Sequence, residues 1–164
     1  DIIVVANPIK SPDGLKSFKR VLQVTEVRKN WEEDPQKEGG FVDLLTYDGK
    51  KDILVPTPDL LNGESDVLKS IASNVKEWAG DWEALWENIQ LRAQMKERLV
   101  ELSHQSGIKD VMEADFVVRS NDAFHMIGEQ VADEAGGIDN KRIFSYWNSW
   151  LEREVKKRGM LKYS

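Results

Sequence analysis

An apolar stretch near the start of the sequence constrains the fold most strongly. Five aliphatic residues follow one another at 2–6, and a second run rich in β-branched residues occupies 21–27. Pro12, Asp13 and Gly14 lie between them, so the sequence predicts a strand, a turn and a second strand. A strand with so many consecutive apolar residues is normally buried on both faces. Because two strands cannot bury it alone, we expect this hairpin to belong to a larger sheet.

The next part of the sequence predicts a second hairpin. A charged loop at 28–40 leads to strand-like residues at 41–47 and 53–55, which are joined by an Asp48-Gly49 turn. Two prolines then end the strand pattern, and we place a domain boundary near Leu61. The first domain is therefore 1–61, and it contains the predicted strands.

The second domain, 62–164, has the apolar spacing of helices. Ser65, Asp81 and Asp139 can each accept hydrogen bonds from the first turn of a helix, and a polar cluster at 120–122 can begin another. The predicted helices span about 65–79, 81–106, 110–118, 120–135 and 139–158. The predicted fold class is α+β, with terminal strands of a larger core followed by about five packed helices.

Composition limits the possible functions. The net charge of -6 opposes the approach of phosphate backbones, so we expect no nucleic-acid partner. The absence of cysteine excludes disulfides, zinc–thiolate sites and thiol catalysis, and it fits a reducing cytosol. No apolar run approaches the ~18 residues that favour a membrane span.

The sequence contains no recognisable catalytic motif. The sequence contains neither G-x-x-x-x-G-K-[ST] nor G-x-G-x-x-G, so we expect no phosphate-binding loop and no cofactor in this chain. His104 and His125 lie outside any metal-binding array, and no serine lies in a G-x-S-x-G turn. The many carboxylates follow polar helix faces, and nothing selects an acid–base pair among them.

Tryptophans and one basic cluster are the candidate interaction residues. Trp31, in the charged loop, either folds back onto the sheet or contacts a partner. Trp147 and Trp150, three residues apart on the last helix, either pack in the core or form an aromatic contact surface. The nearby basic cluster complements the helix dipole or contacts an acidic lipid surface or partner. Its members are Arg153, Lys156, Lys157, Arg158 and Lys162.

Several segments resemble a known family. The opening D-I-I-V-V and the F-K-R-V-L-Q-V-T-E-V at 18–27 resemble the closing strands of the RecA-like core in secretion-type ATPases. These are the motors of type II secretion, type IV pili and the archaellum. In that family a basic pair precedes an R-V-x-x-I-x-E-V strand. Here the pair is Lys19 and Arg20, and Lys19 and Val24 depart mildly from the pattern.

Later segments resemble the archaeal branch of this family. They are F-V-D-L-L-T-Y-D at 41–48, L-K-S-I-A at 68–72, W-E-N-I-Q-L-R at 86–92 and the stretch 99–110, which ends in G-I-K-D. The similarity extends to about residue 130, and 139–164 resembles nothing specific.

The resemblance implies that the ATP-binding and Mg²⁺-binding motifs belong to a segment preceding Asp1. It also implies a cytoplasmic hexamer, peripheral to the inner face of the membrane, whose partners are other subunits and a membrane platform protein. The family's catalytic residues have no counterpart here. Of its other functional residues, only the basic pair Lys19 and Arg20 has one, and its implied place is a subunit contact or the neighbourhood of the nucleotide.

Three hypotheses follow. The first is a non-catalytic C-terminal segment of a secretion ATPase. The second is an independent helical adaptor that binds a partner helix or peptide through Trp147 and Trp150. The third is a stand-alone enzyme with a carboxylate pair.

Overall fold

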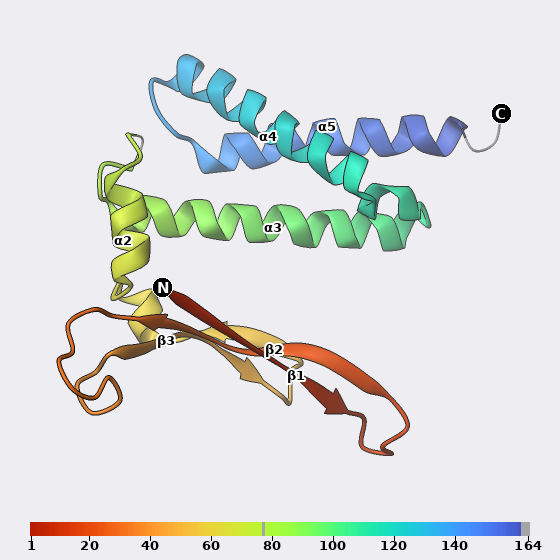
Figure 1. The fold of residues 1–164 in the computed structure, drawn as a ribbon. Coiled ribbons are helices and arrows are strands. Elements are labelled where there is room, and N and C mark those ends of the chain that lie inside the picture. Colours follow the sequence, from red (N-terminus) through yellow and green to blue (C-terminus); the bar gives the residue numbers. More distant parts are fainter. Residues whose placement is uncertain (77, 162–164) are drawn as a thin grey trace. The chain divides into compact units, whose positions relative to one another are not determined.

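The chain forms two compact units. A computed structural model describes residues 1–76 and 78–161. The units are Asp1–Trp82, called here the sheet unit, and Glu83–Ser164, called the helical unit (Figure 1). The predicted boundary near Leu61 marks the change from strands to helices. The sheet unit nevertheless continues past it to Trp82.

The sheet unit contains a four-stranded antiparallel sheet in the order β1-β2-β3-β4. The strands are β1 (Ile2–Lys10), β2 (Ser17–Val27), β3 (Phe41–Asp48) and β4 (Ile53–Pro56). Together with the helices that follow, this arrangement confirms the predicted α+β class. Membership of a RecA-like core stays a prediction.

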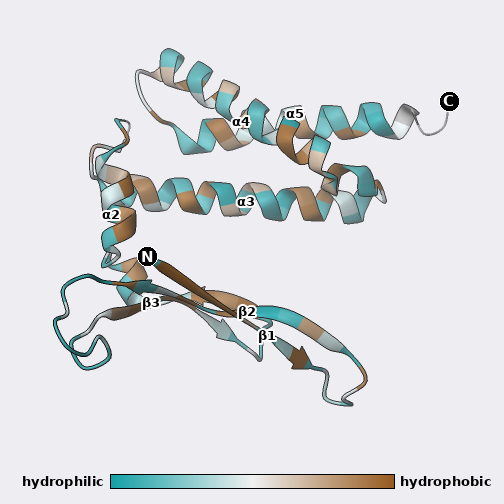
Figure 2. Ribbon diagram, viewed as in Figure 1, coloured by the Kyte–Doolittle hydropathy of each residue, from teal (hydrophilic) through white to brown (hydrophobic). Residues whose placement is uncertain are grey.

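The first strand differs from its prediction in two ways. It continues through Pro8 to Lys10, because β1 is an edge strand and a proline there need not remove a ladder hydrogen bond. It is also mostly exposed, whereas the sequence predicted burial on both faces. Figure 2 shows the hydrophobic colour of β1 along its first half. The predicted turn is confirmed: Asp13 Oδ1 accepts the Leu15 N–H at 3.0 Å, and Gly14 has a φ of 71°.

Two short helices complete the sheet unit. α1 (Pro58–Leu61) is capped by Thr57, whose side chain accepts the Leu60 N–H. α2 (Asp66–Ser73) is capped by Ser65, as predicted, because its Oγ accepts the Leu68 N–H at 3.1 Å. The apolar core of this unit is small, and its buried side chains are Val42, Leu44, Leu60 and Ala72.

α2 ends earlier than the sequence predicted. The helix stops at Ser73 and not before Gly80. Ser73 Oγ donates to the Lys69 carbonyl, and Asn74 Nδ2 donates to the Ser70 carbonyl. Side-chain hydrogen bonds of this kind compete with the backbone ladder, which explains the early end.

The helical unit consists of α3 from its second residue, Glu83, onward, a 3₁₀ turn and two long helices. The elements are α3 (Trp82–Ser106), η1 (Lys109–Met112), α4 (Ala114–Ala135) and α5 (Asn140–Leu161). Gly107 and Gly136 follow α3 and α4 with positive φ, as the sequence predicted.

The caps of α5 are partly as predicted. Asp139 Oδ1 accepts the Arg142 N–H at 3.0 Å, which confirms the predicted start. The predicted end at Gly159 is wrong, because α5 continues to Leu161. A Cβ at Gly159 would lie 3.4 Å from Ile108 Cδ1, so a glycine inside the helix suits this close approach.

The predicted break at 120–122 does not exist. α4 is one continuous helix, and Ser120 is buried within it, where its carbonyl accepts the Trp147 indole N–H at 3.0 Å. This register turns Phe116 and Phe124 into the core. Val117 and Val118, the last residues of the helix predicted at 110–118, are therefore exposed.

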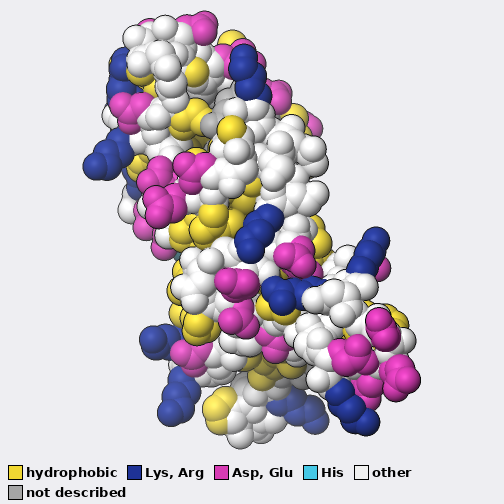
Figure 3. Space-filling model, turned by 90° about the vertical axis from the view of Figure 1, so that its left-hand side faces the viewer, with side chains coloured by type: hydrophobic (Ala, Val, Ile, Leu, Met, Phe, Trp, Pro, Cys, Tyr) yellow, Lys and Arg dark blue, Asp and Glu magenta, His cyan; other side chains and the backbone are white. Residues whose placement is uncertain are grey.

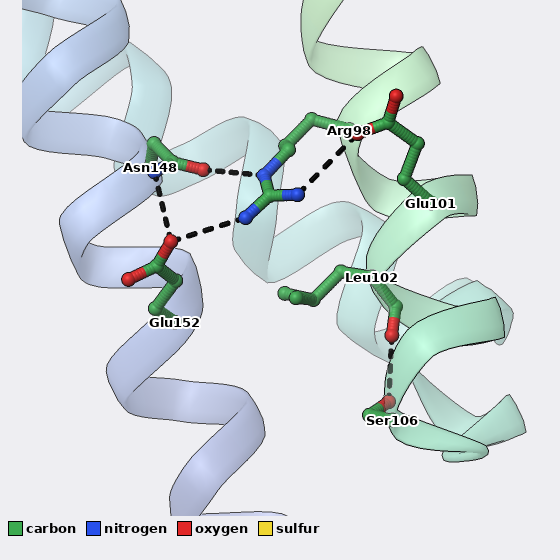
Figure 4. A network of polar contacts seen from close by, with 6 residues as sticks. All are labelled: Arg98, Glu101, Leu102, Ser106, Asn148 and Glu152. Atoms are coloured by element: carbon green, nitrogen blue, oxygen red, sulfur yellow. Dashed lines mark hydrogen bonds and ion pairs between the residues drawn. The ribbon is translucent and has the colours of Figure 1, made fainter.

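The core of the helical unit is larger than that of the sheet unit. Its buried members are Leu91, Met95, Leu99, Ile108, Val111, Phe116, Ala123, Phe124, Val131, Ile143, Trp147, Leu151 and Val155. A polar network also joins α3 to α5 (Figure 4). Arg98 donates to Asn148 Oδ1 at 2.8 Å, to Glu152 Oε1 at 3.1 Å and to Glu101 Oε2 at 3.3 Å.

Candidate interaction surface

The described residues contain no candidate metal centre. Across 1–76 and 78–161 no three His, Asp or Glu side chains gather in a way that could hold a metal ion. His104 and His125 are both exposed. In the same ranges no helix is both long and apolar enough to cross a bilayer.

A hollow of about 760 Å³ lies within the helical unit, beside the loop between α4 and α5. Its lining includes Gln90, Gln94 and Asn140, and Asn140 Nδ2 donates to Glu87 Oε2 at 3.0 Å. The lining pairs no nucleophile with a base, so the hollow does not define a reaction.

The outer edge of β1 is the clearest candidate surface. The backbone carbonyl of Asp1 accepts a hydrogen bond from the Val27 N–H at 2.8 Å, and Ile2 lies opposite Glu26. Hydrogen-bonded and non-hydrogen-bonded pairs alternate along an antiparallel ladder. The backbone N–H and C=O groups of Ile2 and Val4 therefore point away from β2, toward the open side of the sheet.

The side chains along this edge are apolar and exposed. Ile2, Ile3 and Val4 have 43%, 42% and 58% of their surface accessible. Natural edge strands are usually protected by charges, prolines or bulges. In β1 the proline and the charge come late, at Pro8 and Lys10, and the pairing with β2 is regular from Ile2 to Val5, so 2–5 is suited to pairing with another strand.

We expect Val4→Lys to reduce concentration-dependent association of the chain. The substitution places a charge at the middle of the apolar edge, where a pairing strand would have to bury it. Light scattering after size exclusion measures the change in mass. Val100→Lys is the matched control, because Val100 is 41% exposed on α3 and distant from any strand edge in sequence. Equal association of both variants would show that β1 is not the contact.

The two residues of the predicted basic pair have different surroundings. Lys19, on β2, lies opposite Pro8 of β1 and is exposed. Arg20 instead makes a two-point contact with Asp52, with Nε–Oδ1 and Nη2–Oδ2 distances of 2.7 and 2.8 Å. Tyr47 donates to the same carboxylate at 2.7 Å. The Arg20 guanidinium, with the Tyr47 hydroxyl, holds the pKa of Asp52 well below its usual range.

Trp31 lies against the end of its own loop. A Cβ at Gly40 would lie 2.8 Å from Trp31 Cδ1 and from Pro35 Cβ, so the ring closely covers this glycine. The remaining 38% of its surface is exposed. A partner contact through that surface stays a prediction.

The two tryptophans of α5 differ in burial. Trp147 is fully buried and donates its indole N–H to Ser120, so core packing is the correct alternative for this residue. It cannot be part of an exposed contact surface in this fold. Trp150 is half-buried and stacks on Phe116, with ring centroids 6.1 Å apart.

The basic cluster lies near the end of α5. Arg153, Lys156 and Lys157 are exposed, and Lys157 donates to Glu154 Oε1 at 2.7 Å. Arg158 lies over the Phe116 ring at 4.7 Å. Lys162, the last member of the predicted cluster, lies outside the described residues. On the face shown in Figure 3, basic, acidic and hydrophobic side chains are intermixed.

Sequence reasoning missed the buried carboxylate of Glu26. This side chain is 1% exposed and accepts hydrogen bonds from Ser65 Oγ and from the Asp66 N–H, the latter at 2.9 Å. A glutamate between Thr25 and Val27 in an apolar strand was the available signal. Its partner could not be inferred, because Ser65 follows 39 residues later.

Known proteins do not identify the chain. Comparisons with protein-family models, curated proteins and solved structures gave no match.

Proposed function

We propose that this chain is a non-catalytic C-terminal segment of a secretion-type ATPase that makes protein contacts within an ATP-driven motor. The carrying observation is the exposed apolar edge of β1, because a sheet that ends on such a strand is suited to continuation by another strand. The strand beside it, β2, carries the residues that resemble the family motif.

Under this proposal ATP and Mg²⁺ bind to another part of a longer polypeptide. The chain itself lacks a G-x-x-x-x-G-K-[ST] sequence to surround phosphates, and no step of ATP hydrolysis is assigned to its residues. Other subunits of a hexamer and a membrane platform protein are the proposed partners, at the cytoplasmic face of the membrane.

The adaptor hypothesis is less well supported. It requires an exposed aromatic surface at Trp147 and Trp150, and the first of these is buried in the core. An adaptor would have to use other residues of the helical unit.

We expect calorimetry to detect no binding of Mg-ATP to this chain. The reason is the absence of a phosphate loop and of any described carboxylate cluster for Mg²⁺. Titrations with Mg²⁺ alone and with ATP alone are the controls. Saturable binding of Mg-ATP with a Kd of about 1 μM would contradict the proposal, because it requires a nucleotide site within this chain.

A further inference from the structure

The exposed face of α4 is acidic. Asp115, Asp122, Glu129 and Asp133 are separated by seven, seven and four residues and are all exposed. At 3.6 residues per turn these spacings place the four carboxylates along one side of the helix. That side is opposite the buried side, which carries Phe116, Ser120, Phe124 and Val131.

The exposed face of α5 is basic. Lys141, Ser145, Ser149, Arg153 and Lys156 follow one another at spacings of four, four, four and three, and all are exposed. They therefore form one face of the helix, with cations near both of its ends and hydroxyls between them. Because the chain as a whole has a net charge of -6, this concentration of cations on one face is unexpected.

The carboxylates of α5 are partnered within the helical unit. Glu152 lies on the basic face, four residues before Lys156, with 44% of its side chain exposed, and it accepts a hydrogen bond from Arg98 of α3 (Figure 4). Glu154 is half-buried and accepts from Arg119 of α4, at 3.0 Å, and from Lys157. Among the described residues, Arg153 and Lys156 make no ion pair, so their charge is available to a partner.

We propose that the acidic face of α4 in one copy of this chain binds the basic face of α5 in a second copy. The two faces are similar in length: at about 1.5 Å per residue, Asp115–Asp133 extends about 27 Å and Lys141–Lys156 about 22 Å. Val118 and Met126, which are 58% and 69% exposed, add apolar surface beside the acidic residues.

The contact is heterologous, because two different surfaces meet. After one contact forms, the pair still presents one free acidic face and one free basic face, so association continues until a ring closes or a filament grows. The inference rests on the proposed function for the expectation that copies lie side by side in a ring. It goes further by naming the surface that joins them.

A second copy explains both faces, whereas an acidic lipid surface explains only one. Lipid headgroups would attract α5 but repel the carboxylates of α4. Exposed ion pairs contribute little individually, so the association is weak and depends on salt. It therefore differs from pairing through the apolar edge of β1.

Charge reversal with rescue tests the contact. Both variants carry Val4→Lys, so that edge pairing does not contribute. The first adds Arg153→Glu and Lys156→Glu, which makes both faces acidic; the second adds Asp122→Lys and Glu129→Lys, which leaves the α4 face with two carboxylates, two cations and no net charge. We expect each alone to associate at least about tenfold more weakly than Val4→Lys, and a mixture to regain the association.

Sedimentation velocity in about 0.1 M and about 1 M salt is the measurement, because the Debye length falls from about 10 Å to about 3 Å between them. Lys96→Glu with Lys109→Glu is the control for the first variant, because it makes the same charge change at two other exposed residues of the helical unit. Helical circular dichroism confirms folding of each variant. A Val4→Lys chain that stays monomeric in low salt, association unaffected by reversal, or a mixture without rescue would overturn the contact.

Vesicle binding separates a lipid surface from a second copy as the partner of α5. Binding of the Val4→Lys chain to anionic vesicles, lost on reversing Arg153 and Lys156 and accompanied by no self-association, would identify a lipid surface and overturn the contact. Failure of the contact leaves the Mg-ATP titration unchanged, so the proposed function is tested separately.

Discussion

Replacing Glu26 with alanine should destabilise the sheet unit by about 3 kcal/mol, the order expected when a buried, hydrogen-bonded charge is removed and its donors lose their partner. The carboxylate accepts hydrogen bonds from the Ser65 hydroxyl and from the Asp66 and Val67 N–H groups at the start of α2. Negative charge at a helix N-terminus is also favourable. Removing it leaves buried donors without an acceptor beside a small apolar core.

Hydrogen exchange gives the most direct measurement of this loss. In Glu26→Ala we expect faster exchange of the Asp66 and Val67 amides, together with a lower midpoint of urea unfolding for the sheet unit. Glu26→Gln keeps the size and one carbonyl acceptor, so its loss should be smaller. Glu64→Ala is the control, because its side chain is exposed beside the same helix start. Equal stability of Glu26→Ala and Glu64→Ala would show that the cap is unimportant.

The strands of the sheet unit could be predicted because their signals are local. The β-branched runs, Asp13-Gly14 and Asp48-Gly49 each specify a strand or turn within a few residues. The exposure of β1 could not be predicted, because burial depends on which segments cover a strand and not on its own composition. Five apolar residues at 2–6 indicated two buried faces, yet β1 lies at the edge with only β2 beside it.

The helices show the same limit. Ser65 and Asp139 were correctly predicted as caps, since each hydroxyl or carboxylate acts within three residues. Ser120 had the residue type of a cap, but the Trp147 indole and the neighbouring Phe116 and Phe124 fix it inside a continuous helix. Tertiary packing thus overrode a local preference.

The candidate surfaces were predictable only in part. Composition drew attention to Arg153, Lys156 and Lys157, and these residues are exposed. Composition could not show that Arg20 is paired with Asp52, because 32 residues separate them. Nor did the sequence alone show that the exposed faces of α4 and α5 carry opposite charge, since the continuous helix through 120–122 was not predicted.

The second large effect concerns Trp147. We expect Trp147→Ala to destabilise the helical unit by about 3–5 kcal/mol, because it removes the largest fully buried side chain and leaves a cavity among Phe116, Leu151 and their neighbours. Trp147→Phe keeps most of the ring volume but deprives the Ser120 carbonyl of its donor, so the loss should be smaller. Urea unfolding followed by helical circular dichroism measures both.

The comparison with Trp150 decides what this tryptophan does. Trp150 is half-buried and stacks on Phe116, so Trp150→Ala should cost less than Trp147→Ala. A core residue affects the free energy of unfolding of the isolated chain, whereas a partner-contact residue affects binding and leaves that free energy nearly unchanged. A Trp147→Ala chain as stable as the wild type would therefore contradict the buried position and restore the aromatic contact surface of the adaptor hypothesis. If Trp147→Ala does not fold, the Trp147→Phe result still separates the two roles, since only the buried position predicts any loss of stability from exchanging one aromatic ring for another.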